Sequence, residues 1–130
     1  MKNVWIAFGL ALCFILGSSF ASHKGDSMEK LMKKMLTYIE KEKKQIEQNK
    51  PALAFPVAIK QLSTAKAPAK KLVTGHQEFI NTFYDDLNKY YKVKDSTQRV
   101  AAFNTVVNSC IGCHQHECPG PIVRIKKSLF

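Results

Sequence analysis

Two cysteines and a histidine form the run Cys110-Ile111-Gly112-Cys113-His114 near the end of the chain. C-x-x-C-H is the spacing used for covalent attachment of haem c. Each thiol adds across a vinyl group of the porphyrin to form a thioether, and the adjacent histidine ligates the iron. We therefore predict haem c and its iron as the cofactor. Cys110 and Cys113 are the predicted thioether anchors, and His114 is the predicted proximal iron ligand.

Paired cysteines also occur in two other kinds of site. Zinc is the first alternative, because thiolate and imidazole donors suit a tetrahedral site. The zinc donors would be Cys110, Cys113, His116 and Cys118. Structural zinc usually stabilises domains that lack a core, whereas this chain has enough periodic apolar residues for one. A thioredoxin-like redox pair is the second alternative, but such a pair follows a strand, and no strand pattern is visible. We therefore prefer haem c, and interpret His76 and His116 as ordinary surface or packed histidines.

The cysteine pair continues the apolar side of a predicted helix that begins at Asp95 or Ser96. Residues separated by three or four positions lie on one side of a helix. This spacing joins a stripe made of Val100, Phe103, Val107, Cys110 and His114. Pro119-Gly120-Pro121 ends the helix, so the haem motif belongs to its last turns.

A last short turn is predicted over residues 122–127. Its inward-facing residues are Ile122 and Ile125. Its outward-facing residues are all basic: Arg124, Lys126 and Lys127.

The first predicted helix covers residues 26–49, with Asp26 as its cap and Glu29 as the reciprocal partner. Its apolar residues follow a period near 3.6: Met28, Leu31, Met32, Met35, Leu36, Ile39 and Ile46. We interpret its charged residues as a solvated face: Lys33, Lys34, Glu40, Lys41, Glu42, Lys43 and Lys44. Asn49-Lys50-Pro51 ends this helix.

Two more helices are predicted between these segments. A weaker one covers residues 57–65, with Pro56 at its start, and a linker follows over residues 63–75. A clearer helix covers residues 76–92. No stretch has a period of two, and no internal repeat is visible. The predicted fold class is therefore all-α, an antiparallel four-helix bundle with haem c attached to the C-terminal helix.

The first residues carry the pattern of an export signal. Lys2 precedes an uncharged apolar run, and Ser19 and Ala21 occupy the positions that a signal peptidase requires to be small. We predict a cleaved signal over residues 1–21, with an uncleaved anchor as the alternative. The cytochrome domain is then residues 22–130, periplasmic or otherwise exported, with no membrane span after cleavage.

The net charge of the chain indicates what kind of partner it would bind. The chain has 20 Lys and Arg against 10 Asp and Glu, and a balance of about +9 remains once the signal is removed. This charge favours an acidic redox partner, whereas export and the lack of a basic and aromatic cluster argue against nucleic acid.

Cys13 leaves with the signal, so Cys118 is left without a partner among the haem anchors. Burial near the haem and pairing with a second chain, as a homodimer, both remain open for Cys118.

An exported four-helix domain of this length, with Cys110-Ile111-Gly112-Cys113-His114 in its last helix, resembles the class II c-type cytochromes, the cytochrome c-prime family. Low-spin members of that family take a sixth iron ligand from a methionine of the first helix, and other members leave this position open. The resemblance implies Met32 as the sixth ligand, with Met28 and Met35 as alternatives. If the first and last helices are antiparallel neighbours, the beginning of the first helix lies beside the haem.

The chain also departs from that family. Its members often carry an arginine or lysine just after the haem histidine and an arginine in the first helix. Here Glu117 and Cys118 follow one turn after His114, and the first helix has no arginine. Arg124 or Lys126 is a candidate replacement as the partner of a haem propionate.

The predicted function is electron transfer by a c-type cytochrome, because methionine ligation and a charged rim suit a carrier that docks briefly. The alternative is a five-coordinate module that binds nitric oxide or carbon monoxide. We predict no enzymatic activity, since the first helix offers apolar residues where a catalytic haem protein needs a polar acid-base group.

Overall fold

The computed structural model describes residues 26–65 and 75–130. The described residues form helices and no β-strand, which confirms the all-α prediction. The elements are α2 (Met28–Glu47), the 3-10 helix η2 (Val57–Thr64), α3 (His76–Lys92), α4 (Ser96–Glu117) and α5 (Ile122–Lys126). The predicted signal at residues 1–21 lies outside the described residues.

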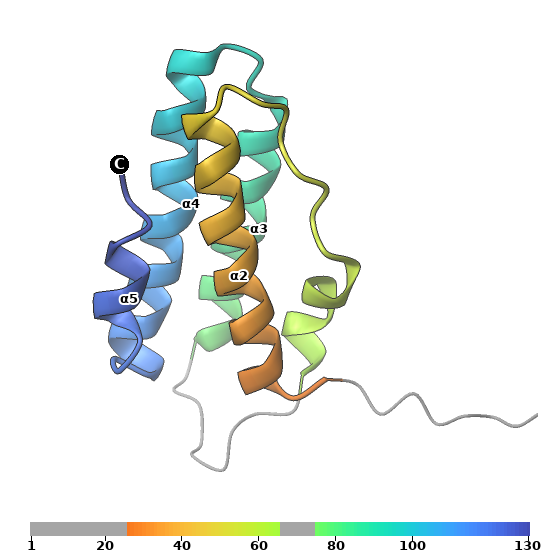
Figure 1. The fold of residues 1–130 in the computed structure, drawn as a ribbon. Helices are drawn as coiled ribbons and strands as arrows, with labels where there is room; N and C mark the ends of the chain where they lie inside the picture. Colours follow the sequence, from red (N-terminus) through yellow and green to blue (C-terminus); the bar gives the residue numbers. More distant parts are fainter. Residues whose placement is uncertain (1–25, 66–74) are drawn as a thin grey trace, which may run out of the picture.

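The three long helices pack side by side (Figure 1). Helices α2 and α3 run in one direction and α4 runs in the other, while the chain between α2 and α3 returns through η2. The beginning of α2 and the end of α4 therefore lie at the same end of the molecule (Figure 1). The second predicted helix is present only as the eight residues of η2.

The ends of α4 follow from its sequence. The Asp95 carboxylate caps the helix by accepting hydrogen bonds from the amides of Thr97 (2.8 Å) and Gln98 (3.0 Å). At the other end the helix stops at Glu117, since a proline disfavours helical conformation in the residue before it.

The cap of α2 differs from the prediction. Ser27 is the capping residue, and its hydroxyl accepts a hydrogen bond from the amide of Lys30 at 3.4 Å. Asp26 instead forms ion pairs with Lys30 (2.7 Å) and Lys34, and Glu29 pairs with Lys33 (2.8 Å). Lysines one or two turns further along the helix bind both carboxylates, so the predicted pairing of Asp26 with Glu29 does not form.

The buried core draws on all five elements. It contains part of the set that the helical period placed inside, together with Tyr38, Val106 and Ile111, which lie beside the predicted stripes. Other residues of the predicted stripes, Met32 and Ile46 among them, are half-buried against this core. Helix α4 buries more than one narrow stripe because α3 packs along it and α5 folds back over it. Its predicted stripe residue Val100 is only half-buried.

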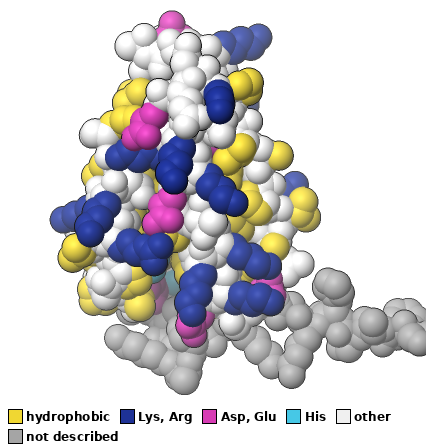
Figure 2. All heavy atoms as spheres, in the orientation of Figure 1, with side chains coloured by type: hydrophobic (Ala, Val, Ile, Leu, Met, Phe, Trp, Pro, Cys, Tyr) yellow, Lys and Arg dark blue, Asp and Glu magenta, His cyan; other side chains and the backbone are white. Residues whose placement is uncertain are grey.

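Basic side chains are numerous on one face of the molecule. Figure 2 shows Lys and Arg side chains over the face formed by α2 and its neighbours, with Asp and Glu side chains between them. None of the helices within residues 26–65 and 75–130 is long and apolar enough to cross a membrane.

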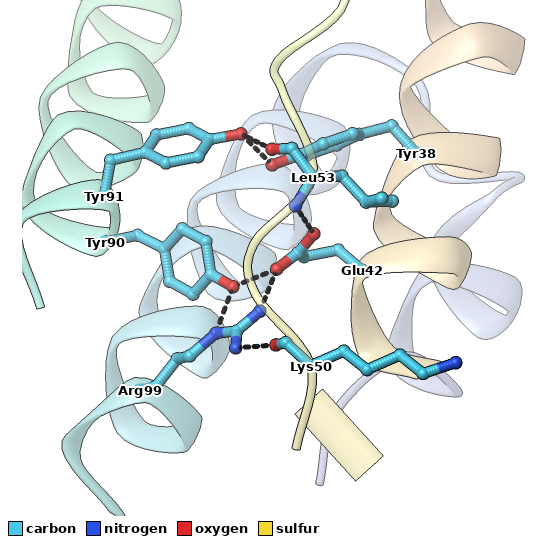
Figure 3. Close-up of polar contacts among 7 residues, drawn as sticks. All are labelled: Tyr38, Glu42, Lys50, Leu53, Tyr90, Tyr91 and Arg99. Carbon is cyan, nitrogen blue, oxygen red and sulfur yellow. Dashed lines mark hydrogen bonds and ion pairs between the residues drawn. The ribbon is translucent and has the colours of Figure 1, made fainter. Parts of the chain in front are cut away.

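Glu42 lies inside the molecule and not on the predicted solvated face of α2, since its side chain is fully buried. Its carboxylate accepts hydrogen bonds from the Arg99 guanidinium (2.6 Å), the Leu53 amide (2.8 Å) and the Tyr90 hydroxyl (Figure 3). Arg99 also donates to the carbonyl of Lys50. Periodicity alone misplaced Glu42 because its partners come from α3, α4 and the chain after α2, far away in sequence.

Two tyrosines extend this network. The hydroxyls of Tyr38 and Tyr91 lie 2.5 Å apart, and Tyr91 donates to the Leu53 carbonyl at 2.7 Å (Figure 3). The segment that returns from α2 therefore has both its amide and its carbonyl at Leu53 bound to helices.

Candidate functional site

Most of the residues predicted to bind haem line one cavity between the helices. Met32 and Met35 of α2 line it together with Cys110, Cys113 and His114 of α4. Met28 does not line it, although its side chain packs against the core nearby. The structure thus brings together residues that are about eighty positions apart in the sequence.

The remaining walls are almost entirely apolar. Leu36 and Ile39 continue the α2 side, α3 contributes Phe79, Ile80 and Phe83, and three further apolar residues come from η2, α4 and α5: Leu62, Val107 and Ile125. The space between these side chains is about 570 Å³ when the part open to solvent is included, but the volume in which a water molecule can be centred is only about 60 Å³. Full insertion of a macrocycle therefore requires these side chains to separate.

The two cysteines lie one turn apart on α4, and both are half-buried. Burial raises the pKa of Cys110 to about 12, with a smaller contribution from Cys113. Burial also raises the pKa of Cys113 to about 11, helped by the negative charge of Glu117. Both groups are therefore neutral thiols at pH 7, the reverse of the lowered pKa that activates a redox cysteine.

The histidine of the motif has a defined orientation. His114 is 9% exposed, and its Nδ1 lies 2.9 Å from the backbone carbonyl oxygen of Cys118. Because a carbonyl can only accept, Nδ1 must donate and carry the proton. The lone pair of the ring is then on Nε2, which is the arrangement that a metal-ligating histidine needs.

The donors of the zinc alternative do not gather. The His116 ring stacks on Phe79, with ring centroids 5.1 Å apart, and Cys118 is exposed. Across the described part of the chain, no three His, Cys, Asp or Glu side chains form a group suited to holding a metal ion. His76 begins α3 and is absent from the lining of the cavity.

Two polar features near the cavity were missed by the sequence interpretation. Ser109 lines the cavity, but its hydroxyl donates to the Asp86 carboxylate of α3 at 2.5 Å. Asp86 also pairs with Lys89 at 3.1 Å. A serine beside a cysteine pair carries no sequence signal for this contact, because α3 provides its partner.

The predicted propionate partners lie on α5, next to Ile125 of the cavity wall. Arg124 is exposed and forms an ion pair with Glu40 of α2 at 3.1 Å. Lys126 is also exposed. Arg124 would therefore have to exchange Glu40 for a propionate.

The donor set fits haem c. One apolar cavity is bordered by two neutral thiols one turn apart and by an imidazole whose Nε2 lone pair is available. The thioether side chains of Met32 and Met35 border it as well. The cavity volume of about 60 Å³ is below the usual range of ligand pockets, so the lining side chains must separate to admit the porphyrin. Comparisons of the chain with protein-family models, curated proteins and solved structures found no match.

Proposed function

We propose that this chain is an exported c-type cytochrome that transfers electrons, a relative of the class II cytochromes of the cytochrome c-prime family. The observation that carries the proposal is the cavity, in which Cys110, Cys113 and His114 face methionines of α2 across apolar walls. The cofactor would be haem c, attached through both thiols.

The proposed architecture is a four-helix bundle in which one of the four helices is short. Helices α2, α3 and α4 supply three positions, and η2 with the segment before it supplies the fourth. The hydroxyl of Tyr84 on α3 donates to the Ile59 carbonyl at 2.7 Å, which holds η2 in that position. Haem would be attached to α4, the last long helix.

The protein side chains would set the behaviour of the iron. Bound haem supplies a centre that takes up and releases one electron. His114 holds its Nε2 lone pair ready for the iron, and Met32 is the proposed sixth ligand. Met35 lines the same cavity and is the first alternative; Met28, which does not, is the second. Thioether ligation favours low-spin iron and a raised reduction potential.

A second candidate function rests on the α2 wall itself. Met32, Met35, Leu36 and Ile39 offer no hydrogen-bonding group to a ligand on the iron. An iron left five-coordinate beside this wall would bind small apolar gases such as carbon monoxide or nitric oxide. The same lack of an acid-base group is why we propose a carrier and not an enzyme.

Haem attachment is tested on the full chain produced with haem supplied in an exporting host. Covalent haem stays with the polypeptide under denaturing electrophoresis, and replacing both thiols, Cys110→Ala with Cys113→Ala, should abolish the haem stain. Cys118→Ala is the matched control and should leave it unchanged. A wild-type chain without covalent haem would refute the proposal.

The sixth ligand is tested with three matched variants, Met32→Leu, Met35→Leu and Met28→Leu. Leucine fills nearly the same volume but cannot ligate iron. We expect Met32→Leu to abolish the near-infrared methionine-to-iron band and give high-spin ferric haem, while Met28→Leu leaves the spectrum unchanged.

Loss of the band in Met35→Leu alone would move the ligand to Met35. A wild-type spectrum that is already high-spin and is unchanged by all three substitutions would contradict methionine ligation and favour gas binding.

A further inference from the structure

The chain leaves the helical conformation at the end of α4, where the backbone of Cys118 contacts His114. Pro119 has no amide hydrogen, and its ring disfavours the helical conformation in the preceding residue. Cys118 accordingly leaves the helix, with φ −157° and ψ 81°. Its amide still donates to the His114 carbonyl at 3.1 Å, while its own carbonyl is freed from the helical direction.

This freed carbonyl is the acceptor of the His114 ring. Nδ1 of His114 lies 2.9 Å from the Cys118 oxygen. The backbone of Cys118 therefore contacts His114 twice: the Cys118 amide donates to the His114 carbonyl, and the Cys118 carbonyl accepts from the His114 ring. In a helix that continued past Cys118, the same carbonyl would point along the helix axis toward later amides.

We propose that Pro119 is a positioning residue for the iron ligand: by ending α4 at Cys118, it aims the Cys118 carbonyl at Nδ1 of His114 and fixes the ring with its Nε2 lone pair available. The inference rests on the proposed haem site and deepens it. A hydrogen bond donated by Nδ1 makes the imidazole more basic. A more basic ligand stabilises ferric iron over ferrous iron and lowers the reduction potential.

Pro121 offers a matched control for Pro119. It lies two residues later in the same turn, and its carbonyl accepts from the amides of Arg124 (2.9 Å) and Ile125 (3.0 Å). The Pro119 carbonyl accepts from the Ile122 amide at 3.1 Å. Alanine keeps either carbonyl, so both substitutions preserve these bonds, but only Pro119→Ala releases the constraint on Cys118.

The first test needs no iron. Nitrogen-15 NMR of the histidine side chains in the full chain distinguishes the Nδ1–H from the Nε2–H tautomer. We expect His114 to be predominantly the Nδ1–H form. Pro119→Ala should lower the ratio of Nδ1–H to Nε2–H about fivefold, the loss expected for one ordinary hydrogen bond. Pro121→Ala and Cys118→Ser should leave this ratio unchanged, because both keep Pro119 and therefore the direction of the Cys118 carbonyl.

The second test uses the haem-loaded protein. Pro119→Ala should raise the reduction potential, while Pro121→Ala should not. Haem staining should be equal in both variants, since the thiols are untouched. A merely structural role for Pro119 would not separate the two prolines in this way.

The proposal is overturned if wild-type His114 is mainly the Nε2–H form, or if Pro119→Ala leaves its tautomer ratio unchanged. The wild-type measurement decides the first point even if the variant fails to fold. A chain that lacks covalent haem but has the Nδ1–H tautomer would refute the proposed function and retain the hydrogen-bond geometry, so the two failures are distinguishable.

Discussion

At the residue scale, the buried carboxylate of Glu42 is the most demanding feature of the core. Taking a carboxylate out of water costs several kcal/mol, which only good partners can offset. Arg99, with 14% of its side chain exposed, supplies the opposite charge at 2.6 Å, and Leu53 and Tyr90 fill further acceptor sites. Burial, followed by the hydrogen bond to Glu42, raises the pKa of Tyr90, so its hydroxyl remains a donor.

Replacing this carboxylate should be costly. We expect Glu42→Gln to lower the free energy of unfolding by about 3–5 kcal/mol, because the Arg99 charge stays partly buried without its partner. Glu40→Gln is the control, since it removes an ion pair to Arg124 that is exposed on both sides, and it should cost about 1 kcal/mol or less. Urea unfolding measures both, and equal costs would contradict the role given to burial.

Asp26 should make stability depend on pH. Hydrogen bonds from Lys30 and Lys34 lower its pKa from 3.8 to about 2 in the folded chain. The folded state therefore favours the charged form, so the stabilisation is complete above about pH 4 and is lost as the pH falls to about 2. Asp26→Asn should be slightly less stable than wild type at pH 6, and the two should converge near pH 2. A constant difference across this range would contradict the ion pairs.

At the element scale, the C-terminal segment closes one side of the cavity. Ile125 of α5 lines the cavity and is 7% exposed. Lys43 of α2 donates to the Leu129 carbonyl at 2.7 Å, and the Phe130 amide donates to Asn104 of α4 at 3.0 Å. The segment is thus attached to both helices whose site residues face each other across the cavity.

Ile125→Ala should loosen this closure. We expect a loss of about 2–3 kcal/mol in the free energy of unfolding, at the low end for a buried isoleucine because one side of it faces the cavity. Val123 lies on the same helix and is 72% exposed, so Val123→Ala should change stability by about 0.5 kcal/mol or less. Thermal unfolding of the two variants compares them directly, and similar shifts would show that α5 does not depend on the cavity contact.

At the scale of the whole molecule, the chain carries an excess of positive charge, and on the face drawn in Figure 2 the basic side chains lie among acidic ones. The full chain has a formal charge of +10. Several of the lysines on α2 are paired, such as Lys30 and Lys34 with Asp26. Long-range attraction should therefore depend on the net charge more than on any single lysine.

Salt should reveal this attraction in the haem-loaded protein. We expect its electron exchange with a small anionic oxidant, ferricyanide, to slow as the ionic strength rises, because salt screens the attraction. The rate with an uncharged oxidant such as a quinone should stay nearly constant. A ferricyanide rate that rises with salt would mean that the exposed haem edge lies in a negative field.

Much of the helical layout could be predicted from the sequence because it is encoded locally. The period of apolar residues placed α2, α3 and α4, and Asp95 and Pro119 marked the ends of α4. The second element was weaker in sequence and is a 3-10 helix in the structure. Ser27 replaced Asp26 as a cap because nearby lysines engaged the aspartate, a competition that capping patterns do not contain.

The sequence by itself determined the chemistry of the site: five consecutive residues specify two thiols and an imidazole, and helical spacing keeps them on the side of α4 that continues its core. Only the tertiary structure decided which residues meet them. Met32 and Met35 reach the cavity whereas Met28 does not, Glu42 turns inward to Arg99, and the Cys118 carbonyl meets His114. The physical reason is that side-chain spacing along one helix is a local property, while the partner that faces each side chain depends on how separate helices pack.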